Sequence, residues 1–200
     1  MTAFSLTSIA GFPGADAIPR ASEAEESMEA ARVRAAQGGC GNSFRLLVEA
    51  HQQRIYHFCF RYLRDAGDAR EACQDVFIRA HRSLGSYRPK AKFSTWLFQI
   101  ALNLCRDKAR ARSGKQEAAL DRHALSMPCH AATPDEAAMR QADLLKLDRG
   151  LKALPDAMRA VLVLCCLEGF SHEESAAILK CSARAVEGRL YRARERQNHQ

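Results

Sequence analysis

Apolar residues recur at helical spacing along most of the chain, and no segment shows the alternation that is typical of a strand. A weakly amphipathic helix is predicted over 23–37, and the glycines at 38, 39 and 41 interrupt it. A long and strongly periodic helix follows. Its apolar stripe consists of Leu47, Val48, His51, Ile55, Phe58, Cys59, Tyr62 and Leu63. The pattern therefore predicts an all-α fold.

Two more helices are predicted before residue 113. Asp68 and Glu71 have the spacing of a capping box, which predicts the start of the third helix after a turn at 65–68. The segment 84–92 contains Gly85 and a proline and is expected to be a loop. Ser94 then caps a fourth helix, which ends in the sequence RDKARAR. The buried side of the third helix is expected to comprise Ala69, Cys73, Val76, Phe77 and Ala80.

The second half of the chain contains a separate helical unit. Periodicity is lost over 113–140, and the prolines at 128 and 134 favour a flexible linker. Three leucines at 144, 147 and 151 then define one helix, and Pro155 opens another that runs to Leu167. We therefore expect two small helical domains, over 23–112 and 141–197, that follow a disordered tail over 1–22.

The segment GFSHEESAAILKCSARAVEGRLYRARER predicts a helix-turn-helix. Ser171 and Glu174 form a capping box for a short helix that ends at Leu179, and a tight turn follows at 180–181. Ser182 can cap the second helix. The residues of that helix that are expected to face inward are Val186, Leu190 and Ala193.

The opposite face of this last helix carries the residue types of a major-groove reader. Arginine donates to guanine, glutamate accepts from cytosine N4, and flanking arginines reach phosphates. Gly188 costs about 1 kcal/mol relative to alanine inside a helix, which suggests close approach of the DNA backbone. The alternative is an ordinary helical hairpin with a solvated basic face. The expected DNA contacts are Arg184, Glu187, Gly188, Arg189, Tyr191 and Arg192.

Charge points to an anionic partner. The chain has 30 Lys and Arg against 23 Asp and Glu, a formal net charge of +7. A second basic concentration runs over 88–112 and is interleaved with aromatic rings, as a single-stranded DNA site requires. The alternative is that the rings are core and the charges are solvated, which is the preferred interpretation for Trp96 and Phe98. Tyr87, Arg88 and Lys90 in the loop are the better candidates for contact.

The third helix presents a different surface, with Glu71, Gln74 and Asp75 around Ile78. An acidic patch repels phosphate, so a protein partner is the economical explanation. The alternative is a plain solvated helix face.

The cysteines indicate neither a metal site nor disulfides. Eight are present and no pair has C-x-x-C spacing, so we expect reduced structural thiols, no metal and no cofactor. Cys129 beside His130, with His123 nearby, is the one cluster of metal-ligand residue types. The chain has no signal peptide and no run of about 18 apolar residues, so we expect a cytoplasmic protein without membrane insertion.

Taken in order, these elements resemble the extracytoplasmic-function group, or group IV, of the sigma-70 family of RNA polymerase sigma factors. The resemblance covers 30–196, with a sigma-2-like helical bundle first and a sigma-4-like helix-turn-helix second. It implies a sigma factor that binds core RNA polymerase and directs promoter-specific transcription initiation. Its implied partners are the polymerase, promoter DNA as duplex and as melted strand, and an anti-sigma factor. It also implies that the protein is not an enzyme.

The resemblance assigns roles to particular positions. The core-polymerase-binding segment corresponds to Asp68, Glu71, Gln74, Asp75 and Phe77. The residues that correspond to the part opening and reading the minus-ten element are Tyr87, Arg88, Lys90, Lys92, Trp96, Asn103, Arg106 and Arg110. The minus-thirty-five reader corresponds to the six outward residues of the last helix, from Arg184 to Arg192. Lys180 departs from the glycine usual in the turn, and Cys181 from the usual aliphatic residue.

Two other functions compete with this interpretation. One is a stand-alone helix-turn-helix transcriptional regulator, which the acidic helix followed by a basic aromatic loop argues against. The other is a thiol or zinc hydrolase that uses Cys129, His130 and His123. No nucleophile and acid–base constellation supports it.

Overall fold

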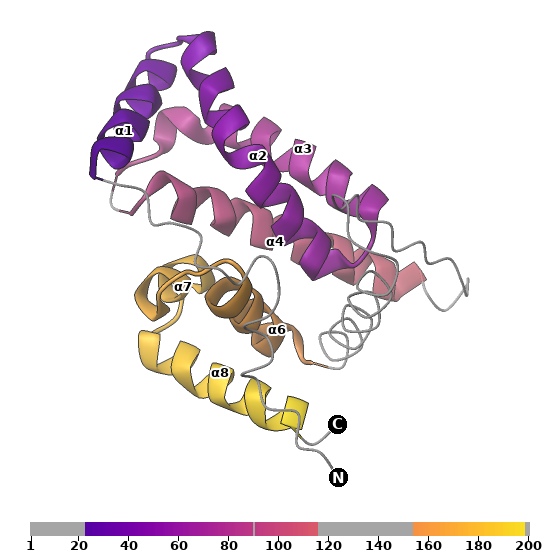
Figure 1. Ribbon diagram of the computed structural model, residues 1–200. Coiled ribbons are helices and arrows are strands. Elements are labelled where there is room, and N and C mark those ends of the chain that lie inside the picture. The colour runs from indigo at the N-terminus through magenta and orange to yellow at the C-terminus, as the bar shows by residue number, and fades with distance from the viewer. Residues whose placement is uncertain (1–22, 90, 116–153, 199–200) are drawn as a thin grey trace, which may run out of the picture.

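The computed structural model describes residues 23–89, 91–115 and 154–198, and every regular element in these ranges is helical (Figure 1). Several expectations lie outside the described residues. They are the disordered tail over 1–22, Lys90, most of the linker with its Cys129, His130 and His123 cluster, and the helix expected around Leu144, Leu147 and Leu151.

The first unit is a four-helix arrangement built around α2. It comprises α1 (Glu23–Gln37), α2 (Gly41–Leu63), α3 (Ala66–Ser83), a short 3-10 turn at Leu84–Ser86, and α4 (Phe93–Lys115). The central helix α2 contacts α1, α3 and α4. Its predicted stripe is largely buried, because these three neighbours cover successive sides of it.

The boundaries of α2 and α4 differ slightly from the expected ones. Gly39 has a φ of 93°, a left-handed conformation that glycine adopts without strain, and it lies in the turn between α1 and α2. Gly41 is therefore free to be the first residue of α2. At the other end of the unit, α4 continues to Lys115, three residues beyond the expected end of the domain.

The capping box predicted from Asp68 and Glu71 is wrong. Arg64 ends α2 with a φ of 58°, which leaves Asp65 as the extended residue before α3. The Asp65 carboxylate accepts a hydrogen bond from the Asp68 backbone N–H at 2.8 Å and so caps the helix. Asp68 already lies in the first turn, and its carboxylate pairs with Arg112 Nε at 2.9 Å.

The second unit contains α6 (Asp156–Leu162), one π-helical turn (Val163–Leu167), α7 (His172–Leu179) and α8 (Ala183–Asn198). The predicted helix from Pro155 to Leu167 is confirmed, with its last turn widened. The capping box at Ser171 and Glu174 is also confirmed, with its two hydrogen bonds at 3.0 and 3.1 Å. The inward stripe of α8 is buried as expected and consists of Val186, Leu190 and Ala193.

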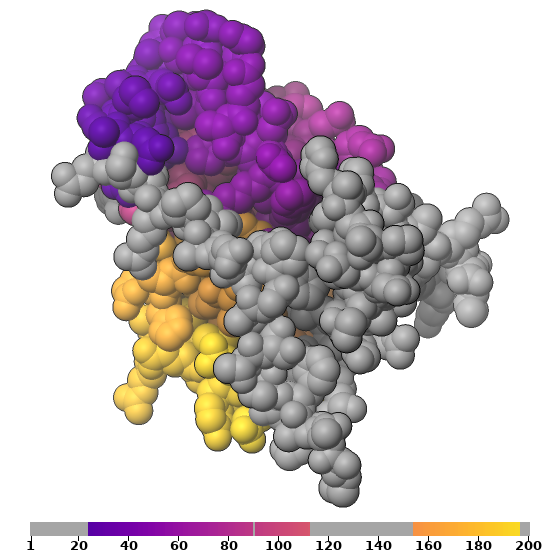
Figure 2. Space-filling view, viewed as in Figure 1, coloured from indigo at the N-terminus to yellow at the C-terminus, as the bar shows by residue number. Residues whose placement is uncertain are grey.

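The two units pack against each other through α4, α6 and α7. In Figure 1 α4 lies between α2 and the pair formed by α6 and α7, and Figure 2 shows the surfaces of the two units adjoining. Phe98 of α4 meets Phe170 edge to face, with ring centroids 4.8 Å apart. Because this contact joins the two apolar interiors, one core runs through both units.

Lys180 in the turn between α7 and α8 has a φ of 53°, which strains a side chain that carries Cβ. Lys180→Gly should raise the free energy of unfolding by about 1 kcal/mol, or the thermal midpoint by about 2–4 °C. Lys180→Ala is the control, since it removes the charge but keeps Cβ. Melting curves followed by circular dichroism measure both, and equal midpoints for the two variants would show that the turn is unstrained.

Candidate nucleic-acid interface

The outward face of α8 is open to solvent. Arg184, Glu187, Tyr191 and Arg192 are exposed, and Tyr191 is 67% exposed although it is a large aromatic residue. Ser182 holds the start of this helix, because its hydroxyl accepts the Ala185 backbone N–H at 3.2 Å. A rigid helix thus presents hydrogen-bonding side chains and one exposed ring along a single face.

Two residues of this face have particular surroundings. Arg189 is half-buried, and its Nη1 donates to Cys181 Sγ at 3.5 Å, so the turn orients this guanidinium. At Gly188, an added Cβ would meet no atom within 4 Å. The packing of the described residues therefore does not require a glycine there.

The loop before α4 differs from the expected arrangement. Tyr87 is only 7% exposed, its ring packs against Phe93 and Trp96, and its hydroxyl donates to the Ala91 carbonyl at 2.7 Å. Burial raises the pKa of Tyr87. Trp96 is only half-buried, so it is more accessible than Tyr87, the reverse of the expected order. Phe98 is fully buried, and its assignment to the core is confirmed. Arg88 projects from the loop and is exposed.

The other predicted residues of α4 fall on two neighbouring stripes. Residues seven apart lie on nearly the same side of a helix, and residues four apart are about 40° further round. Trp96, Asn103 and Arg110 form an open stripe, in which Asn103 is exposed and the Arg110 side chain is 77% exposed. This open stripe combines a ring, an amide and a cation on the surface of one helix.

The second stripe of α4, which we call the covered stripe, contacts the second unit at three points. It consists of Lys92, the residue directly before α4, and of Gln99 and Arg106. Lys92 Nζ lies 3.7 Å from Glu174 Oε1, and Gln99 Nε2 donates to the Ala177 carbonyl at 3.3 Å. Arg106 Nε donates to Asp156 Oδ2 at 2.9 Å. Two of the residues that the resemblance assigns to DNA are therefore paired with carboxylates of α6 and α7.

Asp156 also accepts a hydrogen bond from the hydroxyl of Tyr62, which is buried in α2. Burial and the neighbouring carboxylate both raise the pKa of Tyr62. A single carboxylate of the second unit thus joins α2 and α4 of the first.

A buried carboxylate lies at the centre of the contact between the units. The Glu168 side chain is 1% exposed, and it accepts from Arg61 Nη1 at 2.8 Å and from Arg54 Nε at 3.4 Å. Both arginines also donate to backbone carbonyls, Arg54 to Glu168 and Arg61 to Leu167. Burial raises the pKa of Glu168, and the two positive charges act against that shift. Sequence reasoning did not identify this group.

The signals for the buried carboxylate are nevertheless present in the sequence. Glu168 is the one charged residue in the apolar run VLVLCCLEGF, where a buried charge requires a partner. Arg54 and Arg61 are seven residues apart and so share a side of α2. Helical periodicity does not relate these two arginines to residue 168, because α2 and the segment around Glu168 come together only when the chain folds.

The acidic surface of α3 is partly neutralised by α4. Glu71 pairs with Lys108 at 2.9 Å and Asp68 pairs with Arg112. Gln74 is exposed, and Asp75 is half-buried and has no ion pair with the described residues. Asp75 is therefore the predicted acidic residue whose charge stays available to a partner.

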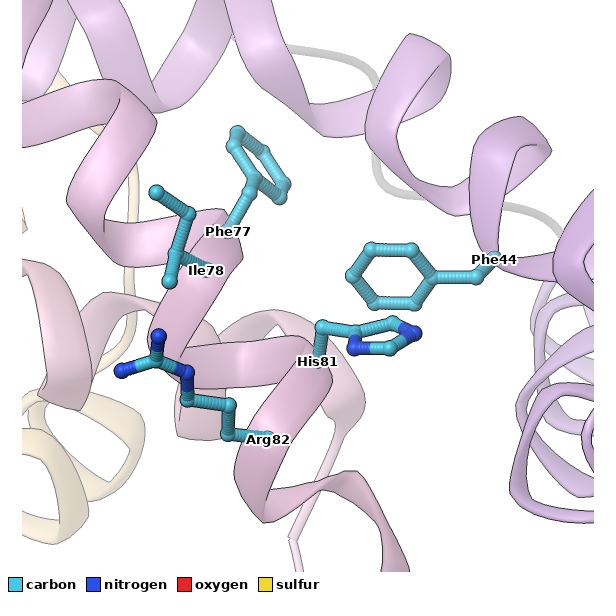
Figure 3. A pocket seen from close by; sticks show the side chains of 5 residues that line it. All are labelled: Phe44, Phe77, Ile78, His81 and Arg82. Carbon is cyan, nitrogen blue, oxygen red and sulfur yellow. The ribbon is translucent and has the colours of Figure 1, made fainter.

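An apolar hollow of about 300 Å³ continues this surface (Figure 3). Ile78 is 49% exposed at its edge, and Phe44 of α2 meets His81 of α3 edge to face at 4.9 Å. Phe77, expected on the buried side of α3, is half-buried and lines the same hollow. Phe44 and His81 carried no functional signal in the sequence, because only the packing of α2 against α3 brings them together.

The cysteines and the remaining ionisable groups add no second site. Within 23–89, 91–115 and 154–198, no group of three or more His, Cys, Asp and Glu side chains could hold a metal ion. Cys59 and Cys105 are fully buried in the first unit, and a hydrogen bond between them raises the pKa of the Cys59 thiol. None of the described helices combines the length and the apolar character needed to cross a bilayer.

Family comparisons match both units. Residues 47–115 match the model of Sigma-70 region 2, and residues 144–196 match that of Sigma-70, region 4. The first match spans most of α2 and all of α3 and α4, and the second spans α6, α7 and nearly all of α8.

Two characterised relatives align over most of the chain. The chain is 32% identical over 174 residues to the RNA polymerase sigma-H factor of Pseudomonas aeruginosa, which covers 82% of this chain and 88% of that protein. It is 30% identical over 179 residues to the ECF RNA polymerase sigma-E factor of Escherichia coli K12, with 86% and 93% covered.

A solved structure has the same architecture. CnrH in complex with the cytosolic domain of CnrY is 27% identical, with a TM-score of 0.66, and the match covers 84% of this chain and 94% of that one. The sigma factor RpoE of Bartonella quintana, in complex with the anti-sigma factor NepR, shares the fold at 22% identity and a TM-score of 0.64, over 78% and 94%.

Proposed function

This chain belongs to the sigma-70 family and is an extracytoplasmic-function sigma factor, and we propose how its surfaces divide the work of promoter-specific transcription initiation. The observation that carries the proposal is that three chemically different surfaces lie on separate helices of one molecule: a hydrogen-bonding face on α8, a basic and aromatic face on α4, and an acidic and apolar face on α3.

The outward face of α8 reads the minus-thirty-five element as duplex DNA. Arg184 and Glu187 are exposed and can reach base edges in the major groove, where arginine pairs with guanine and glutamate with cytosine. Arg189 and Arg192 lie on the flank, where phosphates run. Gly188 lets the DNA backbone come close, and the exposed Tyr191 ring adds contact area.

The face of α4 holds the melted minus-ten strand. The open stripe of Trp96, Asn103 and Arg110 offers one ring for stacking, one amide for a base edge and one cation for a phosphate. Arg88, Lys92 and Arg106 add further positive charge around it, and Lys90 belongs to the same basic segment of the sequence. Tyr87 acts here by packing against Trp96 and so fixing the orientation of that ring.

The face of α3 binds core RNA polymerase. Gln74 and Asp75 supply polar contacts, with Asp68 and Glu71 beside them, and Ile78 and the hollow that Phe77 lines receive an apolar side chain of the polymerase. Acidic and amide side chains beside an apolar hollow suit a protein surface that combines basic and apolar residues. The domain limits follow these surfaces, with residues 23–112 for the polymerase and the minus-ten element and 141–197 for the minus-thirty-five element.

Each of the two helical units can bind its DNA element weakly, because the two units are joined in one chain. A tether of 113–140 makes binding of the second element intramolecular once the first is bound, which raises its effective concentration. An anti-sigma factor is a further expected partner, because the similar solved structures named above are complexes with CnrY and with the anti-sigma factor NepR. The alternative of a stand-alone regulator predicts tight binding to promoter duplex without polymerase.

Asp75→Arg tests the face of α3. It should abolish association with core polymerase and leave the helical content unchanged, because it places a cation on the acidic face without touching the buried stripe of α3. Glu195→Arg, an exposed substitution on α8, is the matched control and should still assemble. Co-purification with core polymerase measures both. Wild-type yield of the Asp75 variant would refute the assignment.

Substitutions on the outward face of α8 should have two different effects: some should change base preference, and others should weaken binding to all promoters. Arg184→Ala or Glu187→Ala should cost about 1–3 kcal/mol at a particular base pair and relax preference there. Arg192→Ala should weaken binding at all promoters and reduce the salt-dependence slope by about one unit. A promoter-library transcription assay with holoenzyme at two salt concentrations separates these outcomes. Uniform loss in all three variants would mean that α8 supplies only electrostatic attraction.

Gly188→Ala should separate stability from recognition. The free protein should become more stable by about 1 kcal/mol, because alanine favours the helix and the added Cβ meets nothing. Holoenzyme binding to minus-thirty-five duplex should nevertheless weaken. Gly41→Ala is the matched control, since its Cβ is also free of contacts and lies in the first unit. Undiminished duplex binding by the Gly188 variant would show that the DNA backbone does not approach closely at this position.

A further inference from the structure

We infer that α1 fixes the geometry of the minus-ten surface, and that Gln37 at its end is a positioning residue for the Trp96 ring. The inference rests on the proposed role of Trp96 in holding the melted strand. The helix α1 precedes the segment 47–115 that matches Sigma-70 region 2. It packs along α2 and also contacts the turn at Leu84–Ser86 and α4 (Figure 1).

The Gln37 side chain joins the end of α1 to the turn before α4. Its Nε2 donates to the carbonyl oxygens of Leu84 and Tyr87, at 2.9 Å in each case. A primary amide carries two hydrogens on this nitrogen, so it can donate to both carbonyls at once. The Leu84 carbonyl also accepts the Tyr87 backbone N–H at 3.0 Å. Gln37 therefore fixes the backbone at both ends of the turn, and with it the position of Tyr87.

The Tyr87 side chain links this turn to Trp96. Its ring centroid lies 5.0 Å from that of Trp96 and 5.8 Å from that of Phe93. Phe93 and Trp96 also contact each other, with centroids 5.5 Å apart. Tyr87 is itself held in place, because it is buried and its hydroxyl donates to the Ala91 carbonyl. Two buried rings therefore set the orientation of the half-buried Trp96 ring.

A second contact of α1 supports Phe93. Glu29 Oε1 lies 2.7 Å from Nε2 of His51, a buried residue of α2. The His51 ring packs against the Phe93 ring, with centroids 5.5 Å apart. The helix α1 thus supports both rings that contact Trp96, Tyr87 through Gln37 and Phe93 through His51.

A third contact lies near the beginning of α1. Glu26 Oε1 pairs with Nζ of Lys92, the residue directly before α4, at 2.6 Å. Glu26 and Gln37 are about three helical turns apart, so they lie on nearly the same side of α1, about 16 Å from each other along its axis. Val33 lies between them on that side and is buried. One face of α1 therefore spans from the Leu84 turn to the start of α4.

Such support matters because a preformed surface binds with less loss of conformational entropy. A base stacks on Trp96 only when the ring has a suitable orientation. Without the contacts of α1, the DNA itself has to order the ring, and less binding energy remains to distinguish one base from another. Loss of the Gln37 donor should therefore relax base preference at the minus-ten element. Preference at the upstream element, which α8 reads, should stay the same.

The structural part of the test uses the free full-length chain. Trp96 is the only tryptophan in the sequence, so its fluorescence reports on this surface directly. Gln37→Glu places an anionic acceptor beside two carbonyl oxygens and should increase acrylamide quenching of Trp96. Gln37→Lys keeps a donor and should leave quenching at the wild-type level. Gln53→Glu is the matched control, since it adds the same charge at an exposed position of α2.

The functional part is a promoter-library transcription assay with holoenzyme. Gln37→Glu should reduce discrimination between bases at the minus-ten positions about fivefold and leave preference at the minus-thirty-five positions unchanged. Gln37→Lys should restore discrimination. Gln37→Met is a second variant that removes the donor without adding a charge at the end of α1, where a negative charge opposes the helix dipole. It should reduce discrimination about twofold.

Several outcomes would overturn the inference. One is wild-type quenching of Trp96 in Gln37→Glu, and another is unchanged minus-ten preference at native helical content by circular dichroism. A third is an equal loss at all promoters, which would indicate a stability effect alone. Equal effects of Gln37→Lys and Gln37→Glu would show that the donor is irrelevant. Absence of any minus-ten preference in wild-type holoenzyme would instead refute the proposed role of α4, and the quenching result would still decide whether α1 positions the Trp96 ring.

Discussion

The arrangement of the two units depends on one buried charge. Glu168 is 1% exposed, and the only charges that compensate it among the described residues come from Arg54 and Arg61 of the other unit. Such a group contributes little net stability, because desolvation offsets attraction, but it penalises every arrangement that leaves it buried and unpaired. The cluster therefore specifies how α6 and α7 sit against α2 and α4. The Phe98 and Phe170 rings beside it supply the apolar contact.

The helix α4 has three functions on three sides. One side is core and contains Leu97, Phe98, Ala101 and Cys105. The open stripe with Trp96 and Arg110 faces solvent, and the covered stripe with Arg106 faces the second unit. A helix that both binds a neighbouring unit and holds DNA cannot do both with the same side chains at once.

Local signals in the sequence predicted local structure well. The Ser171 box and the buried stripe of α8 are confirmed, because capping and helical periodicity depend on residues a few positions apart. The cap of α3 was misassigned, since Asp65 and Asp68 both suit a cap and only the backbone after Arg64 decides between them. Tyr87 and Glu168 show the limit of such reasoning. The partners of Glu168 lie on a helix distant in sequence. Tyr87 packs against Phe93 and Trp96 across an irregular loop, and no spacing rule describes either set of contacts.

Zero-length carbodiimide cross-linking followed by mass spectrometry tests whether the contact between the two units persists in holoenzyme, because the reagent joins amines to carboxylates already in contact. Lys92 lies 2.6 Å from Glu26 of its own unit and 3.7 Å from Glu174 of the other. Both cross-links are expected in the free protein. In holoenzyme, where the second unit binds the upstream element, only the Lys92–Glu26 cross-link is expected, and it serves as the internal control. An undiminished Lys92–Glu174 cross-link in transcriptionally active holoenzyme would contradict this expectation.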